Sequence, residues 1–269
     1  SGAITVSANA AVRNSGLFTL EKASKFNLAG EFKNTKSGKL DDRRTGVNYD
    51  ALTAFALTNE PDVEIYGIDV SRYQRDVDWE KVASSGVDFV MLRAAVGAVN
   101  GAPVAADSKF AEHFAGAREA GLEIGVYMYS YAKTVSEIKT EAKFLVKLLK
   151  DYKITYPVAL DMEELRGYYT DDPSKMAEAF FTIVMDAGYY PIMYSYKSWL
   201  ENLLDASVRD KYAVWVAHTG VNATTYAGNY YMWQYSHTGR ISGINGDVDL
   251  NISYRDFAAF IKKNRLNNL

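Results

Sequence analysis

From Ile65 onward, short runs rich in β-branched and aromatic residues alternate with amphipathic helical stretches. This alternation is typical of βα units built around a parallel sheet. It predicts eight strands, at 65–70, 89–96, 123–131, 157–163, 190–196, 212–218, 230–236 and 247–252. It predicts helices at 79–85, 107–120, 135–151, 173–187, 198–204 and 254–263. Because most helices fall between the early strands, the pattern favours an α/β fold of the incomplete (β/α) barrel type.

The beginning of the chain differs from this regular part. Residues 11–50 are polar and mixed, with no sustained period, which is typical of a linker or an export-side extension. We therefore divide the chain into an N-terminal extension, 1–64, and a barrel, 65–269, and we expect the extension to pack on the barrel. The opening Ser1-Gly2 is typical of a cloning remnant, so we also expect that a native leader has been removed.

Composition excludes several classes of function. The net charge of −3 gives no indication of binding to nucleic acid or to an anionic membrane surface. The chain has no cysteine, so disulfides, thiolate metal sites and a cysteine nucleophile are excluded. No apolar run is long enough to span a membrane. The three histidines, His113, His218 and His237, lack metal-ligand spacing, and we predict neither a metal nor a cofactor.

Acidic residues stand at the ends of several predicted strands. Side chains of a strand alternate between two faces, and in a barrel the inward face supplies the active site at its C-terminal end. In the fourth strand, aliphatic residues share one face while Asp161 and Glu163 share the other. The same alternation directs Asp69 of the first strand inward, together with Asp247 and Asp249 of the last. Three strands therefore deliver carboxylates to one end of the barrel.

Aromatic side chains are expected around these acids. Alternation places on the inward faces of the third, fifth and sixth strands the residues Tyr127, Tyr129, Tyr131, Tyr194, Tyr196 and Trp215. A single strand-end aspartate is often a turn residue. Asp161 with Glu163 is different, because two like charges on adjacent inward positions repel and are costly to bury. Repulsion gives the two carboxyls different pKa values, so that one can act as an acid and the other as a base. Such a pair indicates a carbohydrate-cleaving cleft.

Seven motifs in order resemble one known family. They are Tyr66-Gly-Ile-Asp-Val-Ser-Arg-Tyr-Gln74 with Val77-Asp-Trp79, Phe89-Val-Met-Leu-Arg-Ala94, Gly125-Val-Tyr-Met-Tyr-Ser-Tyr-Ala132, Ala159-Leu-Asp-Met-Glu163, Trp215-Val-Ala217, Trp233-Gln-Tyr-Ser236 and Val248-Asp-Leu-Asn251. Over about residues 65–263 the chain resembles glycoside hydrolase family 25, the Chalaropsis-type lysozymes. Residues 1–64 match nothing in that family.

The resemblance implies a flattened barrel of eight strands with fewer outer helices than strands. It also implies hydrolysis of the β-1,4 bond between N-acetylmuramic acid and N-acetylglucosamine in peptidoglycan glycan strands, by a secreted or cell-wall-associated, bacteriolytic enzyme. By position, Glu163 would be the general acid and Asp161 its partner, with Asp69 and Asp249 completing the acidic cluster. The implied sugar contacts are Tyr129, Tyr194, Trp215 and Gln234.

The stereochemical course and two competing functions stay open at this point. Alternate Cβ atoms of a strand lie about 7 Å apart, which suits an inverting pair, but we favour a substrate-assisted course in which the sugar's N-acetyl group is the nucleophile. A chitinase-like barrel would need acids at positions that hold Tyr156 and Ala159, which disfavours it. A non-catalytic glycan-binding barrel would not need the Asp161/Glu163 pair.

Overall fold

The computed structural model describes residues 63–269 and, within residues 1–62, six short strands. The chain divides into two compact units, Ser1–Thr58 and Asn59–Leu269. In the first unit, each strand pairs in parallel with the strand three places along the chain, as in successive coils of a β-solenoid. These strands are β1 (Ile4–Val6), β2 (Ala11–Asn14), β3 (Leu17–Leu20), β4 (Phe26–Leu28), β5 (Glu31–Asn34) and β6 (Lys39–Asp42).

The sequence did not predict these six strands. Elements of three or four residues are too short to show a two-residue alternation over a useful length. The packing of the extension 1–64 on the barrel stays a prediction.

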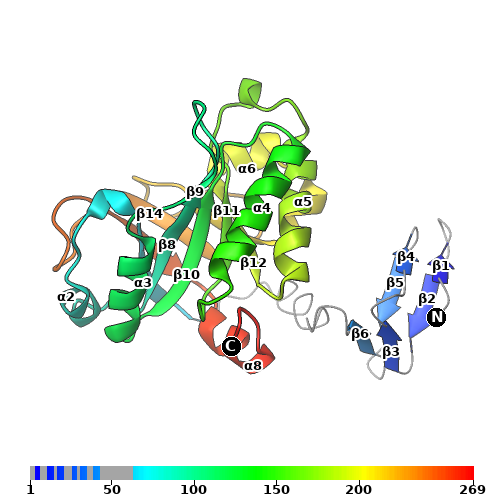
Figure 1. The fold of residues 1–269 in the computed structure, drawn as a ribbon, viewed down its shortest axis with the longest axis horizontal. Helices are drawn as coiled ribbons and strands as arrows, with labels where there is room; N and C mark the ends of the chain where they lie inside the picture. The colour runs from blue at the N-terminus through cyan, green and yellow to red at the C-terminus, as the bar shows by residue number, and fades with distance from the viewer. Residues whose placement is uncertain are drawn as a thin grey trace. The chain divides into compact units, whose positions relative to one another are not determined.

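The second unit is built on a closed barrel of eight strands (Figure 1). They are β7 (Ile65–Val70), β8 (Phe89–Val96), β10 (Glu123–Tyr129), β11 (Val158–Asp161), β12 (Pro191–Tyr196), β13 (Ala213–Ala217), β14 (Met232–Gly239) and β15 (Val248–Ser253). The barrel closes because β8 pairs with both β7 and β10, and the short β9 (Ala105–Ala106) adds to β8 as an extra strand. The predicted eight-stranded barrel is confirmed.

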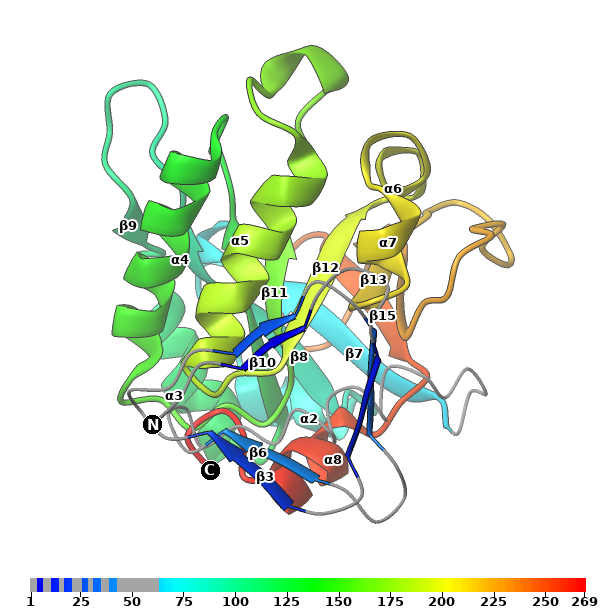
Figure 2. The ribbon, with the colours of Figure 1, turned by 90° about the vertical axis from the view of Figure 1, so that its right-hand side faces the viewer.

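Helices surround the barrel, most of them between its early strands (Figure 2). They are α2 (Trp79–Ser84), α3 (Phe110–Glu119), α4 (Val135–Leu149), α5 (Pro173–Asp186), α6 (Lys197–Leu203), α7 (Ala206–Arg209) and α8 (Phe257–Asn264), with 3₁₀ turns η1 (Arg72–Gln74) and η2 (Arg166–Tyr168). The described residues between β13 and β15 contain no helix. The prediction of fewer outer helices than strands is therefore also confirmed.

Local sequence explains where the helices begin and end. Thr134 and Glu137 form a capping box that satisfies backbone N–H groups at the start of α4. Gly86, Gly121 and Gly188 follow the ends of α2, α3 and α5 with φ of 83°, 80° and 89°. That left-handed backbone favours glycine, which has no Cβ to clash.

The last strand corrects the prediction of an all-parallel sheet. β15 runs antiparallel to both β14 and β7. The connection 240–247 is shorter than the dozen or so residues that a parallel crossover needs, and side-chain alternation is the same in either strand direction. The inward placement of Asp247 was also wrong. Asp247 precedes β15, its side chain is half exposed, and it forms an ion pair with Arg240 at 2.9 Å.

Aromatic side chains fill the N-terminal end of the barrel. Tyr156 and Tyr190, which precede β11 and β12, both pack against Phe257 of α8, at ring-centroid distances of 5.6 Å. Phe89, at the start of β8, stacks on Tyr156 at 4.5 Å. With this end filled, the C-terminal ends of the strands are left to form a site.

Candidate active site

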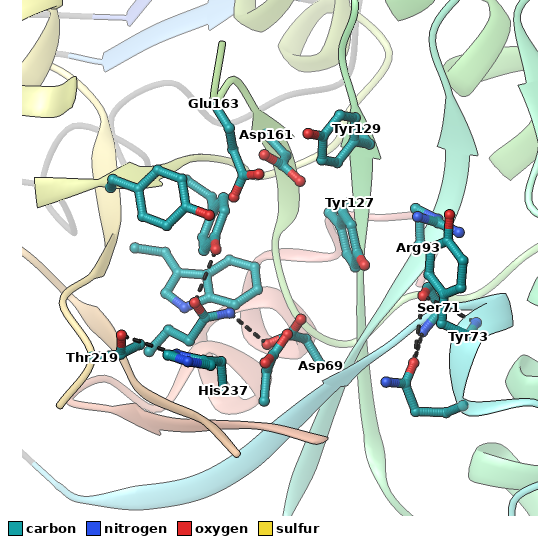
Figure 3. Close-up of a pocket in the computed structure, with 16 residues that line it drawn as sticks. Asp69, Ser71, Tyr73, Arg93, Tyr127, Tyr129, Asp161, Glu163, Thr219 and His237 are labelled. Carbon is teal, nitrogen blue, oxygen red and sulfur yellow. Dashed lines mark hydrogen bonds between the residues drawn. The ribbon is translucent and has the colours of Figure 1, made fainter. Parts of the chain in front are cut away.

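One cavity of about 420 Å³ opens at the C-terminal end of the barrel strands (Figure 3). The structure brings all eight candidate site residues to its wall, from seven strands or the segments that follow them. They are Asp69, Tyr129, Asp161, Glu163, Tyr194, Trp215, Gln234 and Asp249. Alternation of side chains predicted the inward placement of the acids and aromatic residues among them, and the family resemblance implied Gln234. The structure places all of them on one cavity wall, and the chemical role of each stays a prediction.

Asp69 lies at the centre of a buried hydrogen-bond network. Its Oδ2 accepts from Gln234 Nε2 and from Asn251 Nδ2, each at 2.9 Å. Behind these amides, Trp215 Nε1 donates to Asn251 Oδ1 at 2.8 Å and the Tyr194 hydroxyl donates to Gln234 Oε1 at 2.9 Å. Five strands thus hold one carboxyl group, and the polar atoms of Trp215 and Gln234 are already engaged within the protein.

Burial and a neighbouring acid favour the protonated form of Asp69. Burial, followed by the charge of Asp249, raises the pKa of Asp69 well above its usual range, while the Asn251 and Gln234 hydrogen bonds lower it. Asp249 stands directly opposite Asp69 in the β15–β7 pairing, and burial raises its pKa as well. Two carboxyls facing each other in this way favour a state that holds one proton between them.

Asp161 is the last residue of β11, and its side chain points into the cavity. Its side chain is buried, and Oδ1 has no hydrogen-bond partner among the described residues. Burial raises the pKa of Asp161 well above its usual range, and the charges of Glu163 and Asp69 add to this, while Arg93 opposes it. A buried acceptor without a partner costs about 1–3 kcal/mol, so this oxygen is poised to receive a ligand donor.

Glu163 lies two residues beyond the end of β11 rather than within the strand. The segment that carries it is fixed on both sides. The buried Ser195 hydroxyl donates to the Met162 carbonyl, and Trp199 Nε1 donates to the Glu164 carbonyl at 3.0 Å. These bonds fix the backbone that would aim the Glu163 carboxyl into the cavity, which is the orientation visible in Figure 3.

Glu163 is the less buried member of the Asp161/Glu163 pair. Burial raises the pKa of Glu163, and hydrogen bonding with the side chains of Tyr194 and Tyr129 lowers it. With Asp69 and Asp249, four carboxyls of raised pKa share one cavity. Raised pKa values favour the protonated form of a carboxyl, which is the form a general acid requires.

Part of the cavity wall was not predicted from the sequence. The cavity is also lined by Ser71, Tyr73, Gln74, Arg93, Thr219 and His237. Alternation along 89–96 puts Arg93 on the inward face and could have found it, whereas the others lie on loops or near strand ends, where no periodic pattern exists.

The described residues contain no group of three or more histidine, aspartate or glutamate side chains suited to a metal ion. None of the described helices has the length and apolarity needed to cross a bilayer.

The family model "Glycosyl hydrolases family 25" matches residues 68–244, which include most of the barrel and both members of the Asp161/Glu163 pair. The chain belongs to glycosyl hydrolase family 25. The resemblance read from the seven motifs is thereby confirmed, and the chain is a glycoside hydrolase.

Individual relatives agree with the family assignment. The autolytic lysozyme of Clostridium acetobutylicum is 29% identical over 184 residues, which are 68% of this chain and 54% of that protein. The chain thus matches about half the length of this relative. The bacterial lysozyme from Streptomyces coelicolor has a similar structure, with 25% identity, a TM-score of 0.61, and coverage of 77% of this chain and 99% of that one.

A third relative was solved with a ligand. The modular autolysin LytC from Streptococcus pneumoniae, in complex with a synthetic peptidoglycan ligand, has 26% identity and a TM-score of 0.61. The match covers 70% of this chain and 46% of that one.

Proposed function

We propose that this family 25 hydrolase is a muramidase, which cleaves the β-1,4 bond between N-acetylmuramic acid and N-acetylglucosamine in peptidoglycan. The observation that carries the proposal is the convergence of four carboxyl side chains on one cavity walled by tyrosine and tryptophan. Paired carboxyls are what glycoside hydrolysis needs, and aromatic rings suit the apolar faces of sugars. The lysozyme and autolysin relatives support the same substrate.

Glu163 is the proposed general acid, which protonates the glycosidic oxygen as the bond breaks. Asp161 is its partner, and its unused Oδ1 would accept the N–H of the substrate's acetamide group. That hydrogen bond favours the charged form of Asp161, so the proton of the pair moves to Glu163 when substrate binds. Asp69 and Asp249 complete the cluster and, with their shared proton, limit its negative charge.

Sugar contacts are proposed for Tyr129, Tyr194, Trp215 and Gln234. Tyr129 is the half-exposed member and would meet the sugar directly. The other three are buried in the cavity floor, so we assign them contact through the exposed part of the ring or amide and, above all, the positioning of Asp69.

The acetamide is also the proposed nucleophile. Its carbonyl oxygen attacks the anomeric carbon, the leaving oxygen takes the Glu163 proton, and water then opens the cyclic intermediate, so the product keeps the configuration of the substrate. NMR of the first-formed anomer tests this course. Net inversion would rule it out in favour of a water activated by Asp161.

The bond specificity has its own test. Purified peptidoglycan is digested with the protein, the new reducing ends are reduced with borohydride, and the fragments are identified by mass spectrometry. A muramidase yields reduced muramic acid at every new end. Reduced glucosamine at those ends, or no new ends at all, would contradict the proposal.

Because peptidoglycan lies outside the cytoplasmic membrane, we further propose that the enzyme is secreted or associated with the cell wall and that it is bacteriolytic. Detection of the protein in the culture medium or wall fraction of its native host, and clearing of a live-cell suspension on external addition, would support this.

A further inference from the structure

One arginine stands among the acids of the cavity. Arg93 lies near the C-terminal end of β8 on the inward face, and of the described residues that line the cavity it is the only lysine or arginine. Its side chain is 8% exposed. A buried arginine needs partners for its charge and its donors, so each of its contacts is informative.

Asp107 fixes the orientation of this guanidinium. Arg93 Nε donates to Asp107 Oδ2 at 2.7 Å, and the Asp107 side chain is fully buried. The same carboxylate accepts the backbone N–H groups of Arg72 and Lys109, at 3.2 and 2.9 Å, so it cannot turn away. The ion pair already balances the charge of Arg93, and neutralising the catalytic acids does not by itself account for the arginine.

Part of the guanidinium is left without a partner. Arg93 Nη2 is buried and has no hydrogen-bond partner among the described residues. One face of the group is covered by Tyr73, whose ring centroid lies 5.0 Å from Arg93 Cζ, and the Tyr73 side chain is largely exposed. A fixed, charged donor on the wall of a substrate cavity is suited to an oxygen acceptor of the ligand.

We propose that Arg93 Nη2 binds the carbonyl oxygen of the lactyl group of N-acetylmuramic acid and makes the cavity specific for muramic acid. The inference rests on the proposed muramidase function. The two sugars of peptidoglycan differ only at O3, where muramic acid carries a lactyl ether in place of the free hydroxyl of N-acetylglucosamine. The lactyl carbonyl, an amide where a stem peptide is attached and a carboxylate where none is, supplies the acceptor. A site that hydrogen-bonds a substrate group discriminates strongly against analogues that lack it.

The test compares two glycans that differ only in that carbonyl. The first is peptide-free glycan with the free lactyl carboxylate, and the second is the same glycan after chemical reduction of the carboxyl to an alcohol. For each protein, kcat/KM is measured on both glycans with one preparation. The ratio of the two values does not depend on the folded fraction, so it stays interpretable even where a variant is less stable.

The variants are Arg93→Lys and Arg93→Gln, with Arg72→Gln as the matched control. Arg72 also lies against the Tyr73 ring, with Cζ at 5.2 Å, but it does not line the cavity. We expect the wild type and the control to prefer the carboxylate glycan by about tenfold to a hundredfold, which corresponds to one charge-assisted hydrogen bond. We expect Arg93→Gln to bring the ratio close to one and Arg93→Lys to reduce it.

Two results would overturn the proposal: a wild-type ratio near one, or an unchanged ratio in both Arg93 variants. Failure of the muramidase function itself is recognised separately, because the wild type would then release no muramic acid ends from intact peptidoglycan.

Discussion

Replacing Glu141 with glutamine should change how the stability of the barrel depends on pH. Glu141 lies on α4 and is buried, with 2% of its surface exposed. Its carboxylate accepts the Ser130 hydroxyl at 2.6 Å and the Tyr131 N–H at 3.3 Å, directly beyond the end of β10. Glutamine has the same shape and can keep both contacts, but it carries no charge to bury.

The magnitude follows from the pKa of this group. Burial raises the pKa of Glu141 from 4.5 to about 7, against the opposing hydrogen bond from Ser130. The folded state therefore holds the proton more tightly than the unfolded state, and its stabilising effect is full below pH 4.5 and lost as the pH rises through 7. A span of about 2.5 pH units at about 1.4 kcal/mol per unit gives about 3.5 kcal/mol over the whole titration.

Urea denaturation at several values between pH 5 and pH 8 measures this effect. All four tryptophans lie in the barrel, so their fluorescence follows its unfolding. Between these limits, which contain most of the titration, the free energy of unfolding of wild type should fall by about 2.5 kcal/mol relative to Glu141→Gln. Other titrating groups are common to both proteins and cancel. Glu119→Gln, an exposed acid on α3, is the control and should run parallel to wild type. Parallel curves for Glu141→Gln would refute the reasoning.

Three further results are expected. Asn251→Leu should destabilise the barrel by about 1–3 kcal/mol in urea, because the buried Asp69 carboxyl loses one of its two amide donors; an unchanged midpoint would contradict the network. Gly97→Ala should cost about 1–3 kcal/mol, since a Cβ there would lie 2.1 Å from Glu141 Oε1; a stable variant would show that the loop can move. The rate of wall hydrolysis should fall as pH rises above the raised pKa of Glu163, because the general acid then loses its proton; a rate that kept rising with pH would exclude this role.

The eight strands of the barrel and the acidic cluster could be predicted because both depend on the alternation of side chains between the two faces of a strand. A barrel strand must turn apolar residues outward, so Asp161 and Asp69 could only point inward, and glycines marked where helices end. The direction of β15 could not be predicted, because alternation is the same in parallel and antiparallel strands. Asp107 could not be placed either, since its contact with Arg93 joins a loop to a strand and follows no period.

The buried network behind Asp69 shows a second limit of sequence reasoning. Alternation placed Trp215 on the inward face and the family resemblance implied Gln234, and both line the cavity. Their engagement with Asn251, Tyr194 and Asp69 depends on the stagger between non-neighbouring strands, which only the closed barrel defines.

The proposed protonation of the leaving sugar by Glu163 can be tested by comparing three proteins. Clearing of a purified cell-wall suspension is followed for wild type, Glu163→Gln and Glu164→Gln, at equal concentrations of folded protein. The side chain of Glu164 does not line the catalytic cavity, so it is the matched control. We expect Glu163→Gln to clear the suspension at least about 100-fold more slowly and Glu164→Gln to clear it at a rate close to wild type. Clearing by Glu163→Gln at the wild-type rate would contradict this role of Glu163.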